Sequence, residues 1–148
     1  MIDKEIIKVA SNTENHDALD NHTHFSKLKN SICGDDMKIY LIVENNKITN
    51  FKYECESCIY CQASVSLLSR KTKKKSIEKV KNFAQQANIC FDKSTNSFDK
   101  EWKEFDKIMT KNNISRKECL LLPINTMLDA LSKKSLWNLK KYFVGPPF

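Results

Sequence analysis

The chain has 148 residues, of which 41% are hydrophobic and 29% are charged, an ordinary composition for one soluble globular domain. No hydrophobic run approaches the roughly 20 residues of a membrane span, and residues 1–7 lack the pattern of a secretion signal, so we expect a cytoplasmic protein without a membrane partner. The net charge of +7 includes a basic run at 70–75 without interleaved aromatic residues, which favours a solvated face or a docking patch for an acidic protein over nucleic-acid binding.

The first part of the chain predicts little regular structure. Residues 3–10 are expected to form a short helix, and residues 11–31 an irregular arm that contains all three histidines. His22 and His24 have a spacing that suits a metal ion, but a solvated loop is the favoured interpretation.

A β-hairpin is predicted next. Residues 37–43 alternate hydrophobic and polar side chains, which is typical of a half-buried strand, and residues 44–47 suit a tight turn. The return strand covers residues 48–53. Ile48 falls out of its hydrophobic phase, which indicates a β-bulge or a later start of the strand.

Helical patterns follow. Ser57 is expected to cap a helix over residues 58–70, and Ser76 a second helix that ends before Cys90, a thiol of the core or of a loop. A third stripe at helical spacing is interpreted as core and stops at residues 112–113; its members are Phe98, Trp102, Phe105 and Met109.

The last helix begins near Cys119, where Pro123 is tolerated if it lies in the first turn, and residues 144–148 form a frayed tail. Together these elements predict one α+β domain over residues 1–148, with a core over about residues 5–140. In it a small antiparallel sheet carries helices packed on one face.

A turn at Cys33-Gly34-Asp35 precedes the best strand. The chain has only two glycines, and Gly34 can supply a positive φ that aims a thiol and a carboxylate at one point. Cys58 and Cys119 stand at the starts of predicted helices. We therefore expect these four ligands to converge on one metal or cluster site; the alternative is a turn with a buried cysteine.

The six cysteines favour metal or thiol chemistry over a disulfide framework in a cytoplasmic chain. Cys55, Cys58 and Cys61 are spaced as C-x-x-C-x-x-C, but a structural zinc finger needs a second pair that the sequence lacks. A thiol in the first turn of a helix is favoured as the thiolate by the helix dipole. Cys61 shares a helical face with Cys58, so it is either a packing residue beneath the site or an auxiliary ligand.

Three segments resemble the IscU/SufU/NifU N-terminal family of iron–sulfur cluster scaffolds: residues 30–35 (NSICGD), 58–66 (CIYCQASVS) and 116–123 (RKECLLLP). The resemblance extends from about Glu5 to Leu131. It implies that Cys33, Asp35, Cys58 and Cys119 hold iron or a [2Fe-2S] cluster. It also implies that a cysteine desulfurase delivers sulfur, with Cys119 as the persulfide acceptor, and that apo-proteins receive the cluster.

The chain departs from this family at three places. Cys55 and Ser57 replace the usual glycines, Glu118 replaces the histidine of the IscU branch, and residues 114–118 do not reproduce its chaperone-recognition segment L-P-P-V-K. The absence of that histidine is similar to the zinc-binding SufU branch. The resemblance therefore implies a scaffold or transfer protein more than an enzyme, with a zinc-dependent sulfurtransferase that builds no clusters as the alternative.

Overall fold

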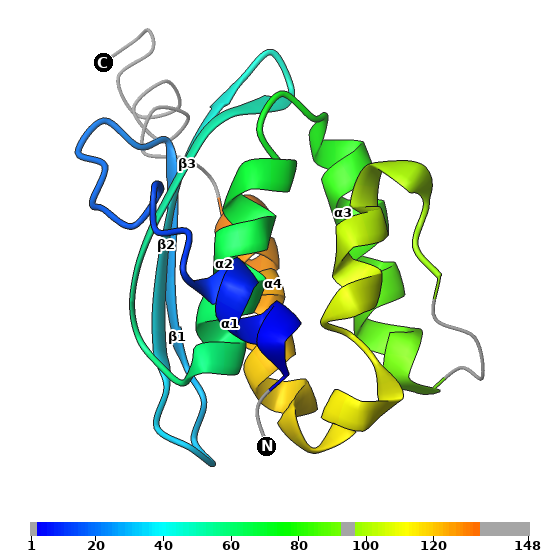
Figure 1. Cartoon of the computed structure of the whole chain (residues 1–148). Coiled ribbons are helices and arrows are strands. Elements are labelled where there is room, and N and C mark those ends of the chain that lie inside the picture. The colour runs from blue at the N-terminus through cyan, green and yellow to red at the C-terminus, as the bar shows by residue number, and fades with distance from the viewer. Residues whose placement is uncertain (1–2, 93–96, 134–148) are drawn as a thin grey trace, which may run out of the picture.

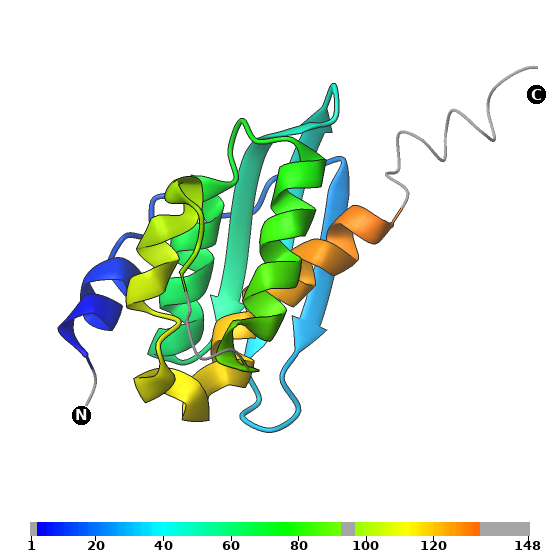
Figure 2. The same cartoon turned by 90° about the vertical axis from the view of Figure 1, so that its right-hand side faces the viewer.

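A layer of helices packs on one face of a three-stranded antiparallel sheet of order β1-β2-β3 in the computed structural model, which describes residues 3–92 and 97–133 (Figures 1 and 2). The predicted α+β architecture is confirmed. The strands are β1 (His24–Lys29), β2 (Asp36–Glu44) and β3 (Lys47–Glu56). The α-helices are α1 (Lys4–Ala10), α2 (Ile59–Lys71), α3 (Ile77–Ile89) and α4 (Lys117–Ser132), and the 3₁₀ helices are η1 (Cys90–Asp92), η2 (Lys100–Lys107) and η3 (Lys111–Arg116).

The predicted β2–β3 hairpin is confirmed. The hydrophobic residues of β2 that face the helices are fully buried, as the alternating pattern requires: Met37, Ile39 and Leu41. Asn45 and Asn46 form the turn with φ of 50° and 63°, a conformation that asparagine tolerates. The register shifts opposite residues 42–43, which leaves Thr49 as the extra residue of a bulge beside Ile48.

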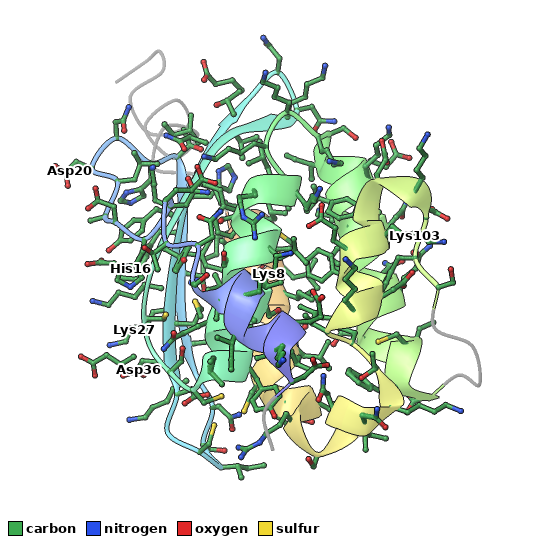
Figure 3. The ribbon with its side chains drawn as sticks, viewed as in Figure 1. Lys8, His16, Asp20, Lys27, Asp36 and Lys103 are labelled. Carbon is green, nitrogen blue, oxygen red and sulfur yellow. The ribbon has the colours of Figure 1, made fainter. Side chains whose placement is uncertain are left out.

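Strand β1 lies in the segment that was predicted to be irregular, so that prediction is wrong for residues 24–29. The hydrophobic pattern of β1 is weak because its fully buried residue is Ser26, whose hydroxyl donates to the Asp129 carboxylate of α4. A satisfied polar residue thus takes the place of a hydrophobic one. Lys27 and Asp36 project from the sheet on the side away from the helices (Figure 3).

The histidines have structural contacts. His24 is a half-buried residue of β1 opposite Leu41 rather than part of a solvated loop. The His22 ring nitrogen Nδ1 lies 2.6 Å from the Leu19 carbonyl oxygen. Neither belongs to the one group of three potential metal ligands found among the described residues.

Helix α2 is the central helix of the layer, and three buried serines connect it to its surroundings. Ser64 Oγ donates to the Leu120 carbonyl of α4 and Ser66 Oγ to the Asn12 carbonyl, both at 2.6 Å. Ser69 accepts from the Asn15 side chain at 3.0 Å. These hydrogen bonds explain how a serine-rich helix can be buried.

The N-cap of α2 is Cys58, not Ser57 as predicted. Cys58 has extended backbone angles (φ −70°, ψ 167°) and its own side chain makes no capping hydrogen bond. Its backbone N–H is instead bound by a carboxylate from the β1–β2 loop. The predicted Ser76 cap is confirmed, because Ser76 accepts from the Lys79 N–H at 3.2 Å and begins α3.

The aromatic stripe is core, as predicted, but η2 is a 3₁₀ helix. Trp102 stacks on Phe83 with a centroid distance of 4.2 Å. The stop predicted at residues 112–113 is wrong, because Asn113 is buried inside η3 and its amide donates to the Ile108 carbonyl at 2.8 Å. The Asn113 amide thus supplies a hydrogen-bond donor to the carbonyl of Ile108, the C-cap of η2.

Pro123 lies inside α4, beyond the first turn in which it was predicted. Since proline has no N–H, it leaves the Cys119 carbonyl without its usual helical donor. Within the described ranges, no helix has both the length and the hydrophobicity to cross a membrane. The predicted tail at 144–148 lies outside the described residues.

The basic run at 70–75 is only partly the solvated face that was predicted, and the docking patch stays a prediction. Lys71 forms an ion pair with Glu104 at 2.6 Å. The Lys75 ammonium lies 4.9 Å from the centroid of the Trp102 ring. These lysines join α2 and the following turn to η2.

Candidate metal centre

Three segments that are distant in the sequence meet at one end of the molecule, the lower end in Figures 1 and 2. They are the β1–β2 loop, the start of α2 and the start of α4. The strand direction explains this arrangement: β1 ends and β2 begins at this end, and β3 returns to it before α2 starts.

The β1–β2 loop folds around Asn30. The Gly34 N–H donates to the Asn30 carbonyl at 2.7 Å, and the Asn30 N–H donates to the Asp35 carbonyl at 2.8 Å. Gly34 has a φ of +76°, which confirms the predicted positive φ. The turn leaves Cys33 exposed and directs Asp35 inward, where it is 6% exposed.

The carboxylate of Asp35 connects the loop to α2. Its Oδ1 accepts the backbone N–H of Cys58 at 3.2 Å. Its Oδ2 is fully buried and has no hydrogen-bond partner among the described residues. Because buried carboxylate oxygens are normally satisfied, this atom fits a metal ligand.

Cys33, Asp35 and Cys119 form a compact group of ligands. One ligand atom of each lies within 4.8 Å of the others, and the two Sγ atoms are 3.8 Å apart. Three of the four residues predicted to converge are thus brought together in a single group.

Cys119 lies in the first turn of α4 and is 4% exposed. Burial raises the pKa of its thiol, and the neighbouring Cys58 and Cys33 thiols raise that pKa further. The thiol is therefore protonated in the metal-free protein, and a bound metal must displace that proton.

Cys58 borders the group without belonging to it. Its thiol is close enough to raise the pKa of Cys119, but it lies outside the 4.8 Å group. As the N-cap, Cys58 precedes the first helical turn in which it was predicted. For Cys58 to serve as a fourth ligand, its thiol would have to move closer to the other three ligand atoms.

The remaining three cysteines are not members of the ligand group, although Cys55 and Cys61 lie close enough to Asp35 for its charge to contribute to raising the pKa of their thiols. Cys61 is fully buried inside α2, and burial raises the pKa of its thiol. Cys55 is half-buried at the end of β3, where burial also raises its pKa. Burial raises the pKa of Cys90, in η1, to about 11.

Two residues beside the site lie in the segments that carry the family resemblance, but the sequence assigned them no role. Ser64 fixes α4 next to Cys119, and the signal available was its place among the three serines of α2. The Arg116 guanidinium lies 5.3 Å from the centroid of the Tyr60 ring, so it joins the starts of α4 and α2. The sequence feature that could have identified Arg116 is its position three residues before Cys119.

Comparison with known proteins gives a consistent result. Residues 1–92 match the family described as the NifU-like N terminal domain. The iron-sulfur cluster assembly scaffold protein IscU of Thermotoga maritima is 28% identical over 137 residues, which cover 91% of this chain and 95% of that protein. An uncharacterized protein of Borreliella burgdorferi is 28% identical over 130 residues, covering 88% and 82%.

Solved structures share the fold. The N-terminal NifU-like protein of Brucella abortus superposes with a TM-score of 0.81 at 18% identity, covering 88% of this chain and 91% of that one. A candidate iron-sulfur cluster assembly scaffold protein for the SUF system of Fervidobacterium islandicum gives a TM-score of 0.79 at 23% identity, covering 88% and 96%.

Proposed function

The chain belongs to the family of NifU-like N-terminal domains, and on that premise we propose that it is a scaffold on which iron–sulfur clusters are assembled and from which they are transferred. The family is one of iron–sulfur cluster assembly scaffolds, and the Thermotoga maritima relative carries that description. In this proposal the cluster is cargo: iron and sulfur enter the site, and apo-proteins receive the product.

One observation carries the proposal: two cysteine sulfurs and a buried carboxylate oxygen lie within 4.8 Å of one another at the end of the sheet. Cys33, Asp35 and Cys119 supply these atoms, and Cys58 is the proposed fourth ligand. Because a [2Fe-2S] cluster is usually held by four thiolates, an oxygen ligand in place of one sulfur favours release of the cluster.

Each ligand has a distinct part in this proposal. Cys119 is fixed in α4 and would accept sulfur from a cysteine desulfurase as a persulfide. Cys33 is exposed on the loop, where it can contact an incoming partner. Asp35 connects the β1–β2 loop to α2 through the Cys58 N–H. Release of a metal from this carboxylate would therefore affect both the loop and the start of the helix.

Anaerobic reconstitution tests the proposal. The metal-free chain is incubated with ferrous iron, a cysteine desulfurase and cysteine, and then separated from free iron. We expect visible absorbance, with iron and acid-labile sulfide in equal amounts, and transfer of both to an apo-ferredoxin. A colourless protein without labile sulfide would contradict the proposal.

A zinc-dependent sulfurtransferase is the second candidate, and the donor set favours it specifically. Three thiolates and one carboxylate oxygen are a complete tetrahedral set for zinc. In that case Cys33, Asp35, Cys58 and Cys119 would hold the ion, and the chain would pass on persulfide sulfur without building clusters. Metal analysis of the anaerobically purified chain distinguishes the two, since this candidate requires stoichiometric zinc and no labile sulfide.

A further inference from the structure

Cys33 and Cys119 differ sharply in burial, although their Sγ atoms are only 3.8 Å apart. Cys33 is the only exposed cysteine among the six, all of which lie in the described ranges, and it stands in a loop beside Gly34. Cys119 is buried in α4, and the next residue, Leu120, is held by the Ser64 hydroxyl at 2.6 Å. The pair therefore consists of an exposed loop thiol facing a buried helical one.

A sulfur–sulfur bond between these residues requires little movement. A disulfide bond is about 2.05 Å long, so the two sulfurs must approach by under about 2 Å. Residues 31–34 are all exposed, and the backbone N–H groups of Ile32 and Gly34 donate to Asn30 within the same loop. Cys33 can thus approach Cys119 without displacing packed side chains.

We propose that Cys33 reduces sulfur held on Cys119: it attacks the Cys119 Sγ of a persulfide, expels hydrosulfide and leaves a Cys33–Cys119 disulfide. This inference rests on the proposed function, because it takes Cys119 as the acceptor of sulfur. It adds to that function a source of sulfide at the metal site itself.

The step is balanced in atoms and electrons. The Cys33 Sγ–Cys119 Sγ bond forms and the bond from Cys119 Sγ to the terminal sulfur breaks, with its electron pair leaving on hydrosulfide. The Cys33 sulfur is oxidised by one electron, from −2 to −1, the terminal sulfur is reduced by one, from −1 to −2, and the Cys119 sulfur stays at −1. The Cys33 proton passes to water. A dithiol reductant then reduces the disulfide and restores the site.

The test uses the metal-free full chain under anaerobic conditions. The native protein and the Cys33→Ser variant are treated with inorganic polysulfide, passed rapidly through a desalting column and followed by peptide mass spectrometry and by assay of hydrosulfide. The native chain should release one hydrosulfide per molecule and contain a Cys33–Cys119 disulfide. The variant should keep one extra sulfur atom on Cys119 and release hydrosulfide roughly tenfold more slowly or not at all.

Two controls keep the result interpretable. Because Cys33 is exposed, Cys33→Ser should keep the native circular dichroism spectrum, and its Cys119 adduct shows that the site is accessible. Cys90→Ser removes a thiol in η1, outside the ligand group, and should behave as the native chain does.

The alternative outcomes are distinct. A stable persulfide on Cys119 in both proteins would overturn the inference and leave sulfur acceptance intact. If the Cys33→Ser variant releases hydrosulfide and forms a Cys58–Cys119 disulfide, the attacking thiol is that of Cys58. That result would also overturn the inference. An extra sulfur found on Cys33 would show transfer without reduction. If neither protein takes sulfur on Cys119, both the inference and the proposed acceptor role fail.

Discussion

The Ser64 hydroxyl donates to the Leu120 carbonyl at 2.6 Å and so joins α2, whose N-cap is Cys58, to α4, which carries Cys119. Both residues are fully buried, and no water is available to replace the bond if it is lost. The distance between the proposed ligands Cys58 and Cys119 therefore depends on a hydrogen bond between two residues that are not ligands, Ser64 and Leu120.

Ser64→Ala should lower the free energy of unfolding by about 1–2 kcal/mol, because a buried hydrogen bond is lost. It should also weaken metal binding by loosening α4 relative to α2. Urea unfolding and competitive zinc titration measure the two effects. Ser132→Ala, an exposed serine at the end of α4, is the matched control and should change neither. Unchanged stability in Ser64→Ala would show that the bond is dispensable.

Cys33→Ala, Cys58→Ala and Cys119→Ala should each abolish tight metal binding, since the loss of one thiolate leaves an incomplete tetrahedral site. Elemental analysis after anaerobic purification provides the measurement. Cys90→Ala is the control: it removes a thiol that lies outside the ligand group, and it should retain the same metal content as the native chain. If one of the first three variants retains stoichiometric metal, the residue it replaces is not a ligand. The Cys58→Ala variant is the most informative, because Cys58 lies outside the compact group.

Asp35→Ala should slow the loss of a reconstituted iron–sulfur cluster, because it removes the oxygen ligand that favours exchange. The rate of transfer to an apo-ferredoxin, followed by circular dichroism, gives the comparison. Asp36→Ala is the control, since Asp36 projects from the other face of the sheet (Figure 3). Transfer from Asp35→Ala that is as fast as from the native chain argues against a role for the carboxylate in release.

Cys61→Ala should leave the metal content unchanged in the otherwise native chain, because Cys61 is fully buried and lies outside the compact ligand group. If Cys61 is an auxiliary ligand, the same change should worsen the metal-binding defect of Cys58→Ser. Zinc affinities of the single and double variants form a double-mutant cycle. Strictly additive values would leave Cys61 with a packing role only.

Stability should fall above pH 10 in part because of Tyr40. Its hydroxyl donates to Glu54 Oε1 at 2.5 Å, and this hydrogen bond, with a smaller effect of burial, raises the pKa of Tyr40 to about 12. Below pH 10 the phenol is neutral in both the folded and the unfolded chain, so its stabilising contribution is complete. Between pH 10 and about 12 the unfolded chain loses the proton first, which favours unfolding.

Urea unfolding at pH 9 and pH 11 measures this contribution. Tyr40→Phe should be less stable than the native chain at pH 9 and should lose less stability on going to pH 11. An equal loss in both proteins would mean that Tyr40 does not titrate differently in the folded state. Tyr53, whose pKa burial also raises to about 12, remains in both proteins and cancels in the comparison.

The local structure that the sequence predicted correctly depends on side chains that are neighbours in the chain. Alternation at Met37, Ile39 and Leu41 identifies β2, because a strand with one buried face requires a period of two. Gly34 and the asparagines at 45–46 identify turns through the backbone angles they tolerate. The same locality made the Cys33-Gly34-Asp35 turn recognisable as a candidate ligand site.

Only the tertiary structure decided the features that depend on residues distant in the sequence. Ser26 belongs to a strand because Asp129 satisfies its hydroxyl from α4, 103 residues later. Cys58 is an N-cap because the Asp35 carboxylate binds its N–H, and Lys71 is paired because η2 brings Glu104 beside it. The sequence thus determined which residue types were available for the site and where the main turns lie. The packing of α2 and α4 on the sheet determined which thiols meet, because a buried polar group takes whichever partner the fold brings within hydrogen-bonding distance.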